Sequence, residues 1–321
     1  NNPAWVLLDV LRRCGWEKDE IDLASFATAA AQCDETVETT DLNGNPTSIP
    51  RYGCNLVLRK RRSAADTVRG IRNSAGLYLT AGADGKLALR TEGSLEYQQP
   101  VKDEGSNATE TLGGGWPIYE FGDGSTGHSG ILRNEHGEPQ FRLWAKPMSD
   151  TPNRFSVELQ DAFNEYQQDS LSMVDFEDVL TSGQETAVTF SALGIPNPDQ
   201  AMRMLKRELH RSVRGNVFAE FGTSVKAIHL RPGDLITITY LREGLERQPF
   251  RVIQIKPQHN YRTVKITAQL HDDAWYAGDE YDATGYAGRQ PRSGVGLPRP
   301  LAGVSTDEFG EQQFEVTEHA M

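Results

Sequence analysis

The glycine-rich segment at residues 127–130 is the first candidate for nucleophilic chemistry. It reads Gly-His-Ser-Gly, with Ser129 between glycines. A serine hydrolase needs Gly-x-Ser-x-Gly between a strand and a helix, so that a sharp turn exposes the serine. Here Ile131 occupies the last glycine position, and no helical periodicity follows. The segment therefore predicts a glycine-rich loop and no serine nucleophile.

The acidic residues Asp175, Glu177 and Asp178 are a candidate for paired-carboxylate chemistry. Glycoside hydrolysis places two carboxylates on either side of a sugar cleft, and one of them must be desolvated. No feature of the sequence indicates such a cleft. A solvated, acidic surface is therefore the simpler interpretation of this cluster.

Two short segments resemble metal-ligand patterns, and each lacks a required feature. Asp41, Asn43 and Asn45 imitate the start of a calcium loop, but Pro46 stands where glycine is needed and no glutamate occupies the twelfth position. The run His271-Asp272-Asp273 is expected at a strand end, where adjacent side chains cannot all face one ion. We predict a turn and a solvated strand end, respectively.

The cysteine content and the net charge exclude further classes of function. Cys14, Cys33 and Cys54 are odd in number and widely spaced, which fits neither a disulfide framework nor a zinc site and favours reduced thiols. The net charge of -12 argues against a general grip on nucleic acid, which depends on Lys and Arg at phosphates. The one basic run, residues 59–62, predicts a solvated surface. We therefore predict no enzyme and assign no catalytic, cofactor-binding or metal-binding residue.

The elements of an N-terminal domain are expected over residues 1–152. Asn2 followed by Pro3 is a helix start, and Asp22 can cap a second helix over 24–33. The further elements we expect are a turn-rich loop at 41–50, a strand at 54–58, a helix from 64 to 76 and a hairpin with strands at 77–80 and 86–90. Residues 98–150 are rich in glycine, and predict an irregular excursion with a short strand at 141–145.

A second domain is expected over residues 153–276, as a small β-barrel covered by one helix. Strands are predicted at 153–159, 216–221, 235–240, 250–255 and 263–268 from their alternation. We expect them to close into a barrel, because open apolar edges invite aggregation. Arg231-Pro232-Gly233-Asp234 predicts a type II turn with a positive φ at Gly233.

The helix of this domain has the clearest start in the chain. Asn197-Pro198-Asp199-Gln200 offers an Asn cap and proline at the first position, which predicts a helix over 199–214. Its apolar residues, which should face the barrel, are Met202, Leu205 and Leu209. Its basic residues, which should face solvent or a neighbour, are Arg203, Lys206 and Arg207.

The fold class predicted from these elements is α+β, mainly β, with two small β-barrel-like domains and appended helices. A length of 321 residues suits two domains of roughly 100–200 residues each. No apolar run approaches the ~18 residues of a membrane span. Residues 277–321 are rich in Gly, Pro and Asp, and predict a linker and the start of a further domain. We expect the sequence to be a segment of a longer protein, because it begins without methionine.

Short motifs follow one another in a recognisable order through both halves. The motifs of the first half are Asn2-Pro3-Ala4-Trp5, Leu8-Asp9, Ile21-Asp22, Cys33-Asp34, Arg51-Tyr52 and Asn55. Those of the second half are Pro152-Asn153-Arg154, Ala192-Leu193-Gly194-Ile195, the helix over 199–214 and Leu230–Asp234. Their order and spacing resemble the central region of the phage tail-tip hub family, which includes J-like attachment proteins and gene-transfer-agent hubs. The excursion at 98–150 is longer than in J-like proteins, which favours a sibling branch.

The resemblance implies a structural protein of a virion or prophage tail tip, a baseplate hub that closes the tail tube. It implies a homotrimer that contacts tail-tube and distal tail proteins and the tape-measure protein, with DNA passing through its channel without specific binding. It also implies synthesis in the bacterial cytoplasm and a role in viral attachment. Residues 296–300 would suit the entry to a fibronectin-like domain.

Two other functions remain as alternatives. A tail-associated glycan hydrolase would use the cluster at 175–178 or the glycine-rich loop, and would show a cleft with a desolvated carboxylate. A carbohydrate-binding module for the host surface would use aromatic residues such as Trp116, Tyr119 and Trp144. Such a module would show a coplanar, exposed aromatic platform.

Overall fold

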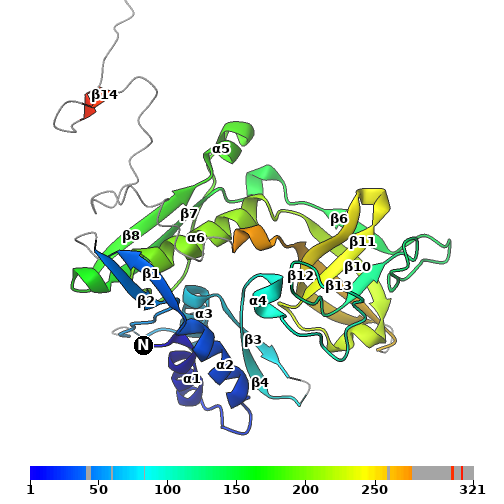
Figure 1. Cartoon of the computed structure of the whole chain (residues 1–321), viewed down its shortest axis with the longest axis horizontal. Helices are drawn as coiled ribbons and strands as arrows, with labels where there is room; N and C mark the ends of the chain where they lie inside the picture. Colours follow the sequence, from blue (N-terminus) through cyan, green and yellow to red (C-terminus); the bar gives the residue numbers. More distant parts are fainter. Residues whose placement is uncertain are drawn as a thin grey trace, which may run out of the picture.

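The computed structural model describes residues 1–40, 45–58, 61–82, 84–258, 261–276, 305–306 and 312–313 (Figure 1). The expected linker and further domain at 277–321 lie outside these residues, except for a short strand pair, β14 (Ser305–Thr306) and β15 (Gln312–Gln313). Among the described residues, no helix combines the length and the apolar character of a membrane span.

Three helices and a hairpin form the N-terminal core. The helices are α1 (Pro3–Arg13), α2 (Leu23–Cys33) and α3 (Ala64–Ala75), and the hairpin joins β3 (Leu77–Ala81) to β4 (Leu87–Thr91). The predicted caps are confirmed: the side chain of Asn2 accepts from the Ala4 amide at 2.9 Å, and Asp22 caps α2. Leu7, Phe26 and Ile71 are fully buried where these elements meet.

The expected strand at 54–58 does not form. The Cys54 amide donates to the Asn1 carbonyl at 2.7 Å, and the Asn55 amide donates to the Gly194 carbonyl at 2.8 Å. The backbone amides of this segment therefore donate to two separate parts of the chain, and they form no β-ladder with a single partner strand. Part of the segment expected as a loop at 41–50 is a strand, β2 (Pro46–Pro50), which pairs antiparallel with β1 (Thr36–Thr40).

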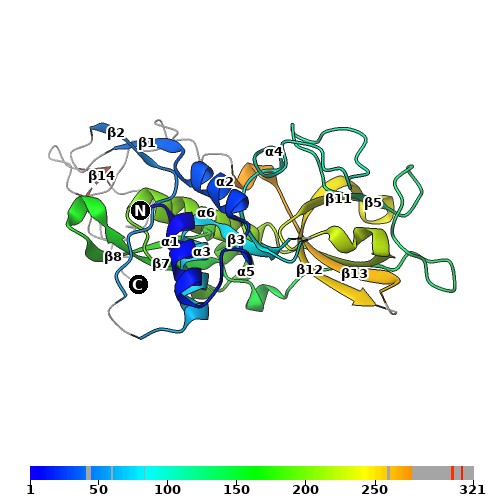
Figure 2. The same cartoon turned by 90° about the horizontal axis from the view of Figure 1, so that it is seen from below.

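A curled, six-stranded sheet forms the other end of the molecule (Figure 2). Its strands, in spatial order, are β5 (Glu120–Gly122), β11 (Leu235–Tyr240), β12 (Leu245–Gln258), β13 (Thr263–Leu270), β10 (Phe218–Ser224) and β6 (Phe141–Trp144). Both edge strands come from the excursion at 98–150. The predicted domain boundary at residue 152 therefore falls between strands of one sheet. The excursion begins beside α4 (Leu95–Gln98) and ends at the 3₁₀ helix η1 (Met148–Asp150).

The expectation that residues 153–159 join this sheet is wrong. They lie in β7 (Arg154–Asp161), which pairs with β8 (Gln167–Val174) and β9 (Ala187–Thr189) in a separate three-stranded sheet. Alternation identifies the apolar face of a strand, but it does not identify the partner strand. No residue of β8 is fully buried, and its first four residues are polar, so the alternation that would have revealed the hairpin is weak. The short helices nearby are η2 (Ala162–Asn164), α5 (Phe176–Ser182), η3 (Val225–His229), η4 (Leu241–Glu243) and η5 (Asp273–Trp275).

The helix α6 (Pro198–Val213) covers β7 and β8, and not the six-stranded sheet. Its cap is as predicted, with the Asn197 side chain accepting from the Gln200 amide at 2.8 Å. Leu205 and Leu209 are buried against β7, while Met204 enters the N-terminal core. In Figure 1, α6 accordingly lies between the strands β7 and β8 and the N-terminal core. The fold is thus mixed α+β and mainly β, with one curled sheet.

Leu205→Ala should destabilise the protein by about 2–5 kcal/mol, because the helix cannot close the cavity that the lost methyl groups leave. Leu205 is 0 % exposed and packs in the cluster formed by α6 and β7. Leu180→Ala is the matched control, since Leu180 is 84 % exposed on α5. Urea unfolding measures both variants. Equal losses would contradict the packing described for α6.

Candidate functional site

The candidate catalytic residues Ser129 and Asp175 lie in different parts of the structure and have separate partners. Ser129 lies in an exposed loop between β5 and β6, where its carbonyl accepts a hydrogen bond from the Gly122 amide at 3.4 Å. Asp175 caps α5: its Oδ1 accepts from the Asp178 amide at 3.1 Å, and its Oδ2 accepts from Arg214 at 2.9 Å. Because Asp175 is buried, the expectation of a wholly solvated cluster is wrong for this residue.

The aromatic residues considered for carbohydrate binding have separate partners. Tyr119 stacks on Phe121 with ring centroids 4.4 Å apart, and Trp144 stacks on Phe218 at 4.4 Å. Trp116 instead lies under the ammonium group of a lysine, 5.3 Å from the ring centroid. Each ring is thus engaged in its own local packing, which does not support a shared binding platform.

His271 is buried, and the expectation of a solvated strand end is wrong for it. Its side chain is 1 % exposed, with Nε2 2.8 Å from Asp273 Oδ1 and Nδ1 3.4 Å from the guanidinium of Arg251. Since an arginine can only donate, Nδ1 accepts and Nε2 carries the proton. Asp273 also accepts from the Leu95 amide at 2.8 Å, which ties η5 to α4.

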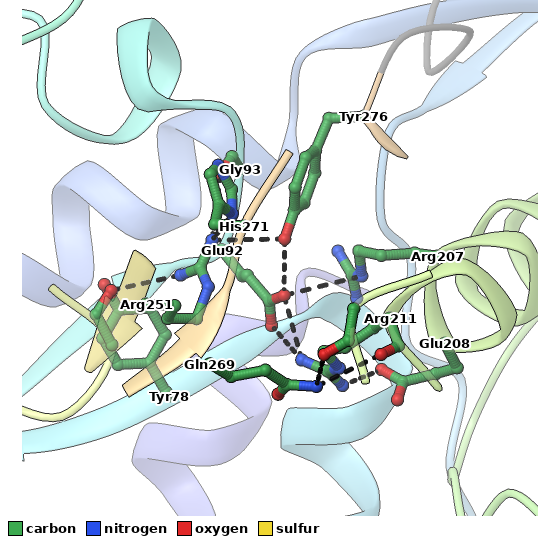
Figure 3. Close-up of polar contacts among 12 residues, drawn as sticks. Tyr78, Glu92, Gly93, Arg207, Glu208, Arg211, Arg251, Gln269, His271 and Tyr276 are labelled. Carbon is green, nitrogen blue, oxygen red and sulfur yellow. Dashed lines mark hydrogen bonds and ion pairs between the residues drawn. The ribbon is translucent and has the colours of Figure 1, made fainter. Parts of the chain in front are cut away.

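A partly buried network of charged and polar residues connects three parts of the molecule. We call this set, Glu92, Arg207, Arg211, Arg251 and Tyr276, the ionic junction (Figure 3). Glu92 follows β4 directly, Arg207 and Arg211 come from α6, Arg251 comes from β12, and Tyr276 follows η5. The junction therefore joins the N-terminal core, the helix α6 and the curled sheet.

Glu92 is the centre of the ionic junction. It accepts from Arg211 at 3.0 and 3.3 Å and from the Tyr276 hydroxyl at 2.7 Å. The Arg207 Nε lies 4.0 Å from the same carboxylate. Arg211 also pairs with Glu208, one helical turn back on α6. The carboxylate of Glu92 thus binds side chains of α6 and the tyrosine hydroxyl that follows η5.

Arg251 connects the curled sheet to the hairpin. It donates to the carbonyls of Gly233 and Gly93, both at 3.1 Å, and to the Tyr276 hydroxyl at 3.2 Å. A fourth hydrogen bond, at 2.8 Å, reaches the side chain of Gln98. Backbone carbonyls are fixed acceptors, so this arginine sets the spacing between β4 and the turn before β11.

Arg207 is the residue for which the expected position is most clearly wrong. It is 4 % exposed, although it was expected to face solvent or a neighbour. Its guanidinium lies against Gly76, where a Cβ atom would come within 2.6 Å of both terminal nitrogens. A glycine at residue 76 thus makes room for the buried cation. Arg203, Arg207 and Arg211 recur at a spacing of four, so the sequence places them on one face of the helix but does not show that this face is buried.

The ionic junction is suited to holding charge and not to transferring protons. Burial alone would raise the pKa of Glu92, but Arg211, Arg207 and Arg251 outweigh it and hold the pKa well below its usual range. Burial raises the pKa of Tyr78, beside the junction, to about 12. Efficient general acids and bases have pKa values near the working pH. None of these groups does, which favours a structural or binding role.

A pocket of about 260 Å³ adjoins the ionic junction. It lies between α3, the hairpin β3–β4, α6 and the turn that precedes β11. Its charged lining residues are Arg72, Glu92, Arg207, Glu208, Arg211 and Arg251. Among the described residues, no group of three or more His, Cys, Asp or Glu side chains is placed to hold a metal ion.

The stability of the protein should fall as the pH drops below about 6.5, in part through His271. Burial lowers the pKa of His271, and the nearby Arg251 lowers it further, against the opposing effect of the hydrogen bond that His271 donates to Asp273. The unfolded chain then takes up a proton that the folded chain does not, which costs up to about 1.4 kcal/mol per pH unit. His271→Gln should reduce this slope in urea unfolding between pH 5 and 6.5, whereas His136→Gln, at an exposed site, should not. An unchanged slope in His271→Gln would contradict the burial of a neutral histidine.

Residues 131–255 match the sequence model of a family described as "Putative phage tail protein". This stretch contains β6, the sheet of β7 to β9, the helix α6, the strands β10 and β11, and most of β12. No protein of curated function matches the chain. The match confirms the resemblance to phage tail proteins.

The fold is similar to that of a chain in the virion of a native gene transfer agent particle, with a TM-score of 0.52 and 12 % identity over 85 % of this chain and 48 % of that one. Lower scores are found for a tail protein from Neisseria meningitidis MC58 (0.43; 13 % identity; 70 % of this chain and 59 % of that one). The 43 kDa tail protein of prophage MuSo2 from Shewanella oneidensis scores 0.39 (12 % identity; 74 % and 61 %). The present chain therefore spans about half to three fifths of these proteins. None of the comparisons indicates a catalytic family.

Proposed function

We propose that this chain is a structural component of a phage or phage-derived tail, and that it forms part of the hub at the tail tip. The observation that carries the proposal is the family match over residues 131–255, which covers part of the curled sheet, the three-stranded sheet and α6. The similarity of fold to a chain of a gene transfer agent virion supports the same function. The ionic junction fits this role, because it makes one mechanical unit of the three parts.

The proposal includes the copy number and the neighbours of the chain in the particle. We propose three copies around the tail axis, in contact with the tail-tube, distal tail and tape-measure proteins, with DNA passing through the channel that they enclose. The acidic chain, with a net charge of -12, suits passage of DNA without a grip on it.

Deletion of the gene from its phage or prophage tests this function. We expect particles with no tail or with an unfinished tail tip, and restoration of the tail by the wild-type gene. Cryo-electron microscopy of intact tails should then show three copies of the chain at the tip. Normal tails from the deletion strain would contradict a tail role, and two or six copies would contradict the trimer.

The purified chain should not degrade peptidoglycan, peptides or esters above background, because its candidate catalytic residues are dispersed. Ser129 is in an exposed loop, Asp175 caps a helix, and the Glu177 side chain is 88 % exposed beside Arg214. Release of dye from labelled peptidoglycan and hydrolysis of chromogenic esters measure this. Turnover that is lost on Ser129→Ala or Glu177→Gln would contradict the prediction.

A further inference from the structure

The pocket beside the ionic junction carries more positive than negative charge. Four guanidinium groups line it, from Arg72, Arg207, Arg211 and Arg251, against two carboxylates, from Glu92 and Glu208. The formal charge of these side chains is therefore two positive. A buried excess of charge is costly when no counter-ion accompanies it.

Arg207 is the least satisfied of these four cations. Arg211 is paired with both carboxylates, and Arg251 is saturated by carbonyl and hydroxyl oxygens. By contrast, the Nε of Arg207 is buried and has no hydrogen-bond partner among the described residues. The carboxylate of Glu92 lies 4.0 Å from it, and a terminal nitrogen of the guanidinium donates to the sulfur of Met204 at 3.1 Å.

We propose that this pocket binds a small, free oxyanion of the phosphate class, with Arg207 as its main ligand. A guanidinium presents parallel N–H donors that match the oxygens of phosphate, and such pairs are the stronger kind of hydrogen bond. The oxyanion supplies acceptors for the donors of Arg207 and offsets the excess charge of the pocket. A phosphate near neutral pH carries up to two negative charges, which equals the excess.

The size and the position of the pocket favour a free ion over the backbone of a nucleic acid. A volume of about 260 Å³ holds one oxyanion with some water, since a water molecule takes about 30 Å³ in the liquid. Arg207 is 4 % exposed, so a polymer would have to separate α6 from the hairpin to reach it. The chain as a whole is also acidic, which repels polyanions.

Thermal unfolding of the full chain in sodium phosphate, against sodium chloride at the same ionic strength, tests the proposal. We expect a saturable rise in Tm of roughly 2–4 °C above chloride. Arg207→Met should abolish the saturable rise and weaken binding of phosphate at least tenfold in calorimetric titration. Arg154→Gln is the matched control, since Arg154 pairs with Glu185 on the three-stranded sheet and should keep the full rise.

A second variant covers the case in which Arg207→Met does not fold. Arg72 lines the same pocket, is partly exposed, and donates to the Leu77 carbonyl at 3.3 Å, so Arg72→Gln should fold and should weaken the phosphate response. A response that is unsaturable and equal in all variants would overturn the proposal, because it would reflect general salt stabilisation. A short oligonucleotide that displaces phosphate from the wild-type chain would likewise overturn the assignment to a free ion.

Discussion

Glu92→Gln should destabilise the protein by about 3–5 kcal/mol, as expected when one partner of a buried ion pair is removed. The substitution keeps the shape of the side chain, and leaves Arg211 and Arg207 without their shared counter-charge. The hydrogen bond from the Tyr276 hydroxyl, at 2.7 Å, also loses its charged acceptor. Urea unfolding at neutral pH measures the loss. Because the junction joins three parts, the variant should also unfold over a broader denaturant range.

Two comparisons make this result specific. Glu177→Gln removes an exposed carboxylate beside Arg214, and should change the stability by no more than about 0.5 kcal/mol. Adding Arg207→Met to Glu92→Gln should restore part of the loss, because Glu92 is the carboxylate nearest to Arg207 and no buried charge at residue 207 is then left unpaired. A single variant as stable as wild type would show that the junction contributes little.

The free energy of unfolding at acidic pH gives a second measure of the contribution of Glu92. Its pKa in the folded protein is held below the value of about 4.3 that an unperturbed glutamate has. The stabilisation by Glu92 is therefore complete above that pH, and is lost as the pH falls toward the lower pKa of the folded state. Glu92→Gln should remove this part of the acid sensitivity.

Gly233→Ala should destabilise the protein by about 2–5 kcal/mol, through a left-handed backbone and a steric clash. The φ of Gly233 is +96°, as predicted for a type II turn, and a Cβ atom there would lie 2.3 Å from the ring of Tyr78. Tyr78 cannot easily withdraw, because its hydroxyl accepts from Gln98 at 2.7 Å. Thermal and urea unfolding measure the effect.

Gly244→Ala separates the two causes. The φ of Gly244 is +72°, but a Cβ atom there would meet nothing within 4 Å, so only the backbone cost of about 1–2 kcal/mol should appear. Tyr78→Ala in the Gly233→Ala background should relieve the clash and recover part of the stability. Equal effects of the two glycine variants would mean that contact with Tyr78 is unimportant.

Local signals in the sequence predicted local structure well. The caps at Asn2, Asp22 and Asn197 and the positive φ at Gly233 depend on neighbouring residues alone, and all four are confirmed. Pairing between distant strands was predicted less well. The apolar face of β7 does not indicate that its partner is β8, because the apolar alternation in β8 is weak. The edge strand β5 is short and lies in a glycine-rich segment, so it was not predicted either.

The ionic junction could not be predicted from the sequence. Glu92, Arg211 and Arg251 lie in three different elements, and each is an ordinary charged residue in its own segment. Arg203, Arg207 and Arg211 lie on the face of α6 opposite Leu205 and Leu209, which is the ordinary pattern of a surface helix. Burial of a charge depends on the elements that surround it, and those are set by the tertiary fold.

The origin of the two edge strands has a consequence for how the chain folds as it leaves the ribosome. Glu120 in β5 pairs with Thr237 in β11, so the partner of β5 is made 117 residues later. At roughly 5–20 residues per second, the apolar segment around Phe121 waits roughly 6–23 s for its place in the sheet. During that interval the segment is open to association with other nascent chains. Synthesis of the chain at lower temperature or with abundant chaperones should therefore raise its soluble yield more than any change at its folded surface.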